Sequence, residues 1–247
     1  MANERNPTLE IRNFGPIEHA ELEFGDLTVL VGPQGAGKSL VLQWLKLALD
    51  AEPIARSLEE SGVDLRGISA SQAVDVIFGE GMAQALQSDT QVMFDGRPVR
   101  PEIIGSRSWG SAGEAARMSE GVMGFVTADV GKPRPAKVFV IPAHRALLLV
   151  DGWVAPFARH PVGTPVVVRL FAQALYEDLS RLGVGTLFPV EHAFAPEIHA
   201  QIDRGVFHGA RVELRQHALR QRRLELLHAG EVGLPYMVWT AGQREFT

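Results

Sequence analysis

The amino-acid sequence predicts an α/β fold built around a phosphate-binding loop. Residues 27–31 form a nearly continuous apolar run with the length and composition of a buried strand. Residues 32–39 follow directly and match the pattern G-x-x-x-x-G-K-[ST]. Residues 40–49 are then rich in strong helix formers. A strand, a glycine-rich turn and a helix in this order place backbone N–H groups and a helix N-terminus around a phosphate group.

The loop pattern assigns a chemical role to its residues. The glycines let consecutive backbone N–H groups face the phosphates, Lys38 is expected to reach the β- and γ-phosphates, and Ser39 is expected to bind Mg²⁺. We therefore expect ATP and Mg²⁺ as cofactors. GTP is disfavoured, because the guanine-reading pattern N-K-x-D requires an asparagine and the chain has asparagine only at positions 3, 6 and 13. The residues expected to hold the nucleotide are Gly32, Pro33, Gln34, Gly35, Ala36, Gly37, Lys38, Ser39 and Leu40.

Two short segments with strand character precede the loop. Residues 8–14 and 19–24 each alternate apolar and polar side chains, and Gly15-Pro16 between them is a turn signal. They predict an N-terminal antiparallel β-hairpin that feeds the loop strand. This arrangement differs from P-loop kinases and small GTPases, in which the loop follows the first strand almost at once.

Composition excludes some classes of protein. The 247 residues carry a net charge of −5, so the chain as a whole does not attract nucleic acid. It contains no cysteine, which excludes disulfides and thiolate metal sites and favours a reducing compartment. Neither a signal peptide nor an apolar run of membrane-spanning length is present in the sequence. We therefore expect a cytoplasmic protein without a membrane partner.

The sequence Arg12-Asn13-Phe14-Gly15-Pro16-Ile17, followed by the loop pattern, resembles a known family. Residues 9–49 are similar to the N-terminal lobe of ABC-type ATPases of the SMC/Rad50/RecF-like group, and in particular to the OLD-like AAA ATPases. The resemblance implies an ABC-type ATPase head, with Arg12 and Asn13 beside the bound nucleotide. The alternative is that these two side chains only end an edge strand.

A second resemblance lies near the C-terminus. Residues 235–239 are expected to form a strand, and residues 240–246, T-A-G-Q-R-E-F, are similar to the signature S-[AS]-G-Q-R-E of the OLD-like ATPases. In that family the signature contacts the γ-phosphate held by the other subunit, which implies a homodimer closed around ATP. Thr240, Gly242 and Gln243 would then join Lys38 as catalytic residues. The alternative is that Thr240 only caps a helix.

The carboxylates that hydrolysis needs are not found where the resemblance implies them. ATP hydrolysis uses an Asp on Mg²⁺ and a Glu beside the attacking water, and in this family their strand follows the signature. The sequence ends at Thr247, so we expect a head that is incomplete at the C-terminus, either a fragment or half of a split protein. Asp151, after the apolar residues 147–150, is the alternative metal ligand. His144 and Arg145 lie in a segment similar to the family's I-P-A-x-R and are candidate pocket residues or solvated turn residues.

We expect three segments: an N-terminal ATPase lobe (1–52), an insertion of mixed helix and loop (53–135) and the remainder of the lobe leading to the signature (136–247). Helical stretches are predicted around 54–60, 71–87 and 164–182, and strands at 138–141, 211–214 and 223–226. A basic cluster could meet a phosphate backbone, but its interleaved glutamates favour a solvated strand pair. The cluster consists of Arg215, Arg220, Arg222 and Arg223.

Three functions remain open from the sequence. The first is a dimeric ABC-type ATPase controlling DNA processing or anti-phage defence, with DNA or a nuclease effector as candidate partners. The second is a nucleotide sensor that does not hydrolyse ATP. The third is a phosphotransferase that uses Lys38 and Asp151, in which the signature match is accidental.

Overall fold

The computed structural model describes residues 6–105, 135–143, 148–150, 152–188, 195–217, 222–228, 233–236 and 239. The chain divides into two compact units. Unit 1 consists of Met1–Val140 and Pro161–Arg169, and unit 2 consists of Ile141–His160 and Leu170–Thr247.

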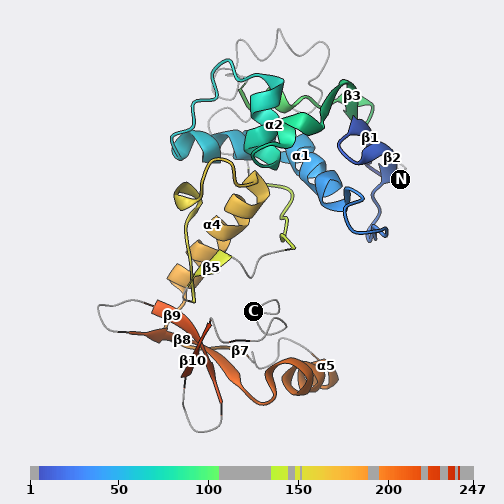
Figure 1. The fold of residues 1–247 in the computed structure, drawn as a ribbon. Coiled ribbons are helices and arrows are strands. Elements are labelled where there is room, and N and C mark those ends of the chain that lie inside the picture. Colours follow the sequence, from blue (N-terminus) through green and yellow to red (C-terminus); the bar gives the residue numbers. More distant parts are fainter. Residues whose placement is uncertain are drawn as a thin grey trace. The chain divides into compact units, whose positions relative to one another are not determined.

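Unit 1 begins with the β-hairpin that the sequence predicts. Strand β1 (Thr8–Phe14) pairs antiparallel with β2 (Ile17–Glu23) on one side and with β3 (Leu86–Phe94) on the other. Strand β4 (Arg97–Pro98) completes a sheet of order β2-β1-β3-β4. Figure 1 labels the first three strands of this unit, β1, β2 and β3. Because β3 comes from the segment expected to be an insertion, that segment contributes to the same sheet as the hairpin.

A bulge in β1 determines which side chains reach the core. Leu9 and Ile11 are fully buried, as the alternation predicts. The alternation then breaks at Asn13, which has a φ of 53° and lies at a register shift in the pairing with β3. The extra residue turns Phe14 inward, where its ring lies 5.1 Å from that of Trp44 and 5.2 Å from that of Phe78.

Two helices supply the rest of this core. Helix α1 (Lys38–Glu60) carries Trp44, and α2 (Ala70–Phe78) carries Phe78. Helix α2 begins with a capping box and stops at Gly79, which has a φ of +118°. Two single-turn 3₁₀ segments, Met82–Ala85 and Pro101–Gly105, complete this part of the unit. The helix predicted for 71–87 is therefore too long, because the glycines at 79 and 81 adopt left-handed backbone conformations that end it.

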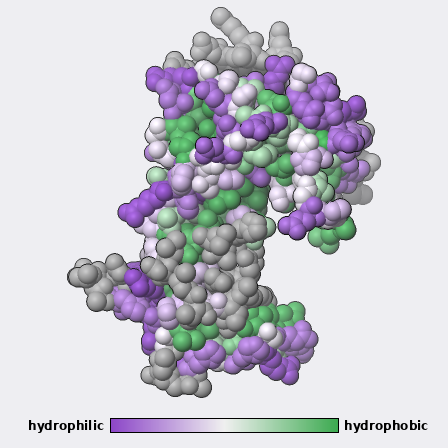
Figure 2. Space-filling model, viewed as in Figure 1, coloured by the Kyte–Doolittle hydropathy of each residue, from purple (hydrophilic) through white to green (hydrophobic). Residues whose placement is uncertain are grey.

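The segment between β2 and α1 differs from the prediction. Residues 27–31 were expected to form a buried strand, yet Leu27 and Val31 are 85% and 90% exposed, and no strand in the described part of the chain pairs with them. Apolar side chains appear at the surface where this segment leads into α1 (Figure 2). Residues 138–141 likewise join no strand pair within the described ranges. An apolar run predicts burial only if a partner strand is present, and the sequence pattern does not supply the partner.

Unit 2 contains a separate antiparallel sheet. Its order is β10-β9-β8-β7, formed by Gly233–Pro235, Arg222–Leu227, Arg211–Gln216 and Gly185–Phe188. The predicted pair β8 and β9 is confirmed, with Val212 opposite Leu226 and Leu214 opposite Leu224 on a buried apolar face. The remaining elements are the hairpin strands β5 (Leu149–Val150) and β6 (Trp153–Val154), the 3₁₀ turn Phe157–Arg159, helix α5 (Pro196–Ile202) and the π-turn Asp203–Phe207.

Helix α4 (Val166–Arg181) begins in unit 1 and continues into unit 2. Its C-terminus explains part of the basic cluster. Arg222 donates hydrogen bonds from Nη1 to the carbonyl oxygens of Ser180 (3.1 Å) and Leu182 (2.9 Å), which the last turn of a helix leaves without intrahelical donors. Arg215 faces Glu213 and Glu225. These contacts support the solvated strand pair over a phosphate-binding surface; Arg220 lies outside the described residues.

In the described ranges, helices with both the length and the apolar character needed to cross a lipid bilayer are absent.

Candidate phosphate-binding site

The glycine-rich loop adopts a tight turn directly before α1. Gly35 and Gly37 have φ values of 81° and 89°, in the left-handed region where a Cβ is disfavoured. The Ala36 N–H donates to the carbonyl oxygen of Pro33 at 3.3 Å, which closes the turn. The residues from Gly32 to Ala36 are exposed. The loop backbone is therefore accessible to a ligand.

The turn of the β1–β2 hairpin packs against this loop. A Cβ added to Gly37 would lie 2.5 Å from Cγ1 of Ile17 and 3.5 Å from Cγ of Pro16. One added to Gly15 would lie 3.8 Å from Cδ1 of Leu40. Gly37 is thus required twice, by its positive φ and by the close approach of Ile17. The sequence motif did not single out Ile17 as a neighbour of the loop, because only the folded hairpin brings it there.

Lys38, the first residue of α1, folds its side chain back over the loop. Its Nζ donates to the carbonyl oxygens of Gly32 (2.8 Å) and Pro33 (2.7 Å). An ammonium group has three N–H donors, so these two bonds leave one for a ligand. The two carbonyl oxygens fix the charge at the loop, where it would meet a phosphate oxygen.

The N-terminus of α1 is suited to an anion. Among the described residues, no side chain caps it, and its first turn contains no acidic residue. The Val41 N–H makes the helical hydrogen bond to Gly37 O at 3.0 Å, so the N–H groups before it lack intrahelical acceptors. The helix dipole adds a partial positive charge at the same end. Ser39 lies in this first turn and is exposed, so its hydroxyl is accessible to a metal ion that accompanies a bound phosphate.

The polar groups of Arg12 and Asn13 contact acidic side chains of the unit 1 sheet. Arg12 donates from Nε to Glu10 at 2.6 Å, and Asn13 donates from Nδ2 to Asp89 in β3 at 2.7 Å. The hydrogen bond from Arg12, with a further one from His19, lowers the pKa of Glu10, while partial desolvation opposes this shift. These contacts place Arg12 and Asn13 on strand β1, just before the turn that meets the loop. Their expected position beside a nucleotide stays a prediction.

Several predicted site residues lie outside the described residues: His144, Arg145, Asp151, Thr240, Gly242 and Gln243. The structure therefore does not test the signature or the alternative metal ligand. The described residues contain no cluster of three or more His, Asp or Glu side chains arranged for a metal ion.

Comparison with known families adds an independent finding. Residues 8–98 match a family model described as an AAA domain. The matched range contains the hairpin, the loop, α1, α2, β3 and β4. The match indicates that this part of the chain is similar to the domains of AAA-type nucleotide-binding ATPases. Comparisons with curated proteins and with solved structures gave no match.

Proposed function

We propose that the chain binds Mg²⁺-ATP at residues 32–40. One arrangement carries the proposal: an uncapped helix N-terminus, with the Lys38 ammonium held beside it by two loop carbonyl oxygens. Backbone donors, a helix dipole and a fixed cation are the groups that proteins combine to bind phosphates. The AAA domain match covers the whole of this arrangement.

The roles of the residues follow from their chemistry. The backbone N–H groups of Gly35, Gly37 and Lys38 would bind phosphate oxygens. The remaining N–H of the Lys38 ammonium would neutralise charge on the β- and γ-phosphates. The Ser39 hydroxyl would be one ligand of Mg²⁺, which supplies further neutralisation of the phosphates when bound. In the leading model, Thr240, Gly242 and Gln243 complete the site in a second subunit.

The wider function proposed is that of an ABC-type, OLD-like ATPase head. It would dimerise around ATP and, in the complete protein or complex, hydrolyse it to control DNA processing or anti-phage defence. The support for this part is the resemblance of residues 9–49 and 240–246 to that group. A sensor that binds ATP without hydrolysing it uses the same loop and differs only in turnover.

The test measures mass and turnover together. Light scattering on a sizing column, with and without Mg²⁺-ATP, is combined with an assay of phosphate release. We expect ATP to convert a monomer to a dimer, with little turnover by this chain alone. Thr240→Arg should retain ATP binding by the monomer and abolish the dimer. Steady turnover by a monomer would contradict the dimeric head and favour a self-contained enzyme that uses Asp151.

A further inference from the structure

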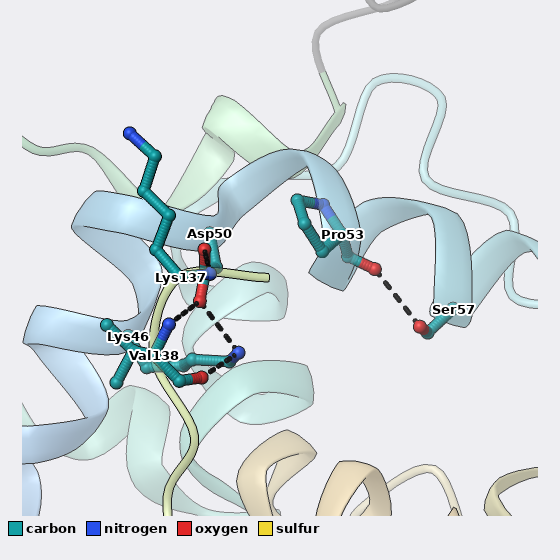
Figure 3. Close-up of polar contacts among 6 residues, drawn as sticks. All are labelled: Lys46, Asp50, Pro53, Ser57, Lys137 and Val138. Atoms are coloured by element: carbon teal, nitrogen blue, oxygen red, sulfur yellow. Dashed lines mark hydrogen bonds and ion pairs between the residues drawn. The ribbon is translucent and has the colours of Figure 1, made fainter. Parts of the chain in front are cut away.

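A buried ion pair on α1 holds a distant piece of backbone. Lys46 and Asp50 are one turn apart and only 4% and 1% exposed. Their Nζ and Oδ2 atoms lie 2.8 Å apart (Figure 3). Charged groups buried this deeply need hydrogen bonds beyond those of the ion pair itself, because burial removes them from water.

The other partners belong to residues 137 and 138. Asp50 accepts the N–H of Lys137 at Oδ1 (2.7 Å) and the N–H of Val138 at Oδ2 (2.8 Å). Lys46 donates to the carbonyl oxygen of Val138 at 2.5 Å. The pair thus binds both backbone groups of Val138, as a neighbouring strand would (Figure 3). We call this set of four hydrogen bonds the α1 clasp.

The clasp lies on the helix that begins at the loop. Between Lys38 and Asp50 the backbone of α1 is helical, and its one non-helical residue is Asp50 itself, with φ −129° and ψ 29°. Pro53 follows and cannot donate to the carbonyl of Leu49, which explains a kink at this point. A rigid helix of about 18 Å therefore connects the loop to the clasp.

The clasp also lies where the chain leaves unit 1. The unit ends at Val140, two residues after the clasped Val138. The last residue of unit 1 before its final exit, Arg169, donates to the Ser61 hydroxyl at 3.3 Å, and Ser61 caps the C-terminus of α1. At each of the two places where the chain leaves unit 1, a nearby residue is thus hydrogen-bonded to α1 or to its C-terminal cap, and α1 is the helix that begins at the phosphate loop.

We propose that Lys46 and Asp50 are positioning residues that couple residues 137–140 to the phosphate loop. This inference rests on the proposed nucleotide binding. A bound phosphate orders the first turns of α1, the buried pair moves with the helix, and the backbone of residues 137 and 138 is thereby stabilised. Because coupling between two sites is reciprocal, the clasped segment strengthens nucleotide binding in return.

Hydrogen–deuterium exchange on the full chain, with and without saturating Mg²⁺-ATP, tests the coupling. ATP should slow exchange in peptides from the loop (30–41) and also in peptides containing residues 137 and 138. The double variant Lys46→Met/Asp50→Leu removes both charges together, so that neither is left buried without its partner. It should retain the loop protection, lose the ATP-dependent protection at 137–138, and weaken ATP affinity about fivefold or more.

The matched control is the pair Glu52 and Arg56, which has the same spacing on the same helix and a contact of 2.7 Å. Glu52→Leu/Arg56→Met should leave both protections in place and ATP affinity within about twofold, as expected for a partly solvated pair. A merely structural clasp would lower the melting temperature of the double variant and leave its ATP affinity unchanged.

The outcomes separate this inference from the proposed function. If ATP slows exchange in the loop of the unaltered chain but not at residues 137–138, the coupling is overturned and nucleotide binding is left intact. Unchanged ATP affinity in a folded double variant would also overturn it. Absence of ATP-dependent protection anywhere would overturn the proposed function, and the coupling with it.

Discussion

Two lysines on α1, eight positions apart, have opposite surroundings. Lys38 begins the helix, is half-buried, and donates to two carbonyl oxygens of an exposed loop. Lys46 is buried and donates to the buried carboxylate of Asp50 and to the carbonyl oxygen of the half-buried Val138. The ammonium group of Lys38 keeps one N–H beyond its two hydrogen bonds to the loop, whereas that of Lys46 is engaged with Asp50 and Val138.

The accessible end of this helix is therefore suited to binding a ligand, whereas its buried part stabilises the folded chain. A phosphate-binding end must keep its donors accessible, so it contributes little to the free energy of unfolding. A buried charge must be compensated, so the loss of its partner is costly. Substitutions at the two ends of this segment should therefore affect different measurements.

The largest effect on stability is expected for Asp50→Ala. It leaves the Lys46 ammonium and the N–H groups of Lys137 and Val138 without their buried acceptor. We expect a loss of about 3–5 kcal/mol in the free energy of unfolding. Urea unfolding monitored by far-UV circular dichroism measures it. Glu52→Ala on the same helix should cost less than about 1 kcal/mol. Equal costs for the two variants would show that the buried carboxylate of Asp50 is no more important to stability than that of Glu52.

Gly37→Ala is expected to have an intermediate effect. Its Cβ would lie 2.5 Å from Ile17 at a φ of 89°, so strain and overlap add, and we expect about 2–3 kcal/mol of destabilisation. Gly35→Ala is the matched control, since its φ is 81° but no atom lies within 4 Å of the added Cβ. It should cost about 1 kcal/mol. Thermal unfolding without nucleotide compares the two, and a smaller loss for Gly37→Ala would contradict the contact with the hairpin.

The smallest effect is expected at Glu10. Its pKa is lowered in the folded chain, chiefly by the hydrogen bond from Arg12, so ionised Glu10 favours the folded state. That contribution is present above the pKa of the unfolded chain and is lost as the pH falls through the lower folded value. Glu10→Gln should therefore reduce the unfolding midpoint slightly at pH 7 and by a smaller amount at pH 3. An equal reduction at both pH values would show that the effect does not come from the lowered pKa of Glu10.

The sequence predicted the elements that local signals define. Alternation located β1, β2, β8 and β9, and the glycine pattern located the loop and the start of α1. It did not predict that residues 27–31 lack a strand partner among the described residues, because pairing depends on other parts of the sheet. Nor did it predict the bulge at Asn13, which depends on the register with β3.

The site was predicted to a similar extent. The motif predicted the positive-φ glycines and a lysine at the start of α1, since these depend on the loop backbone alone, while their roles in nucleotide binding stay predictions. It did not identify Ile17 or the Lys46–Asp50 pair, whose roles arise from contacts across 20 to 92 positions of sequence. One signal was available for the pair: a Lys and an Asp at i,i+4 occupy positions that continue the apolar face of α1 between Trp44, Leu47 and Ile54.

Titration calorimetry of Mg²⁺-ATP into the unaltered chain and into Lys38→Ala tests the central claim most directly. We predict saturable binding by the unaltered chain and loss of binding in Lys38→Ala. Melting temperatures without nucleotide should be nearly equal, because the hydrogen bonds of Lys38 to the described residues are made to an exposed loop. Equal ATP affinity in the two proteins would contradict the assignment of residues 32–40 as the nucleotide site.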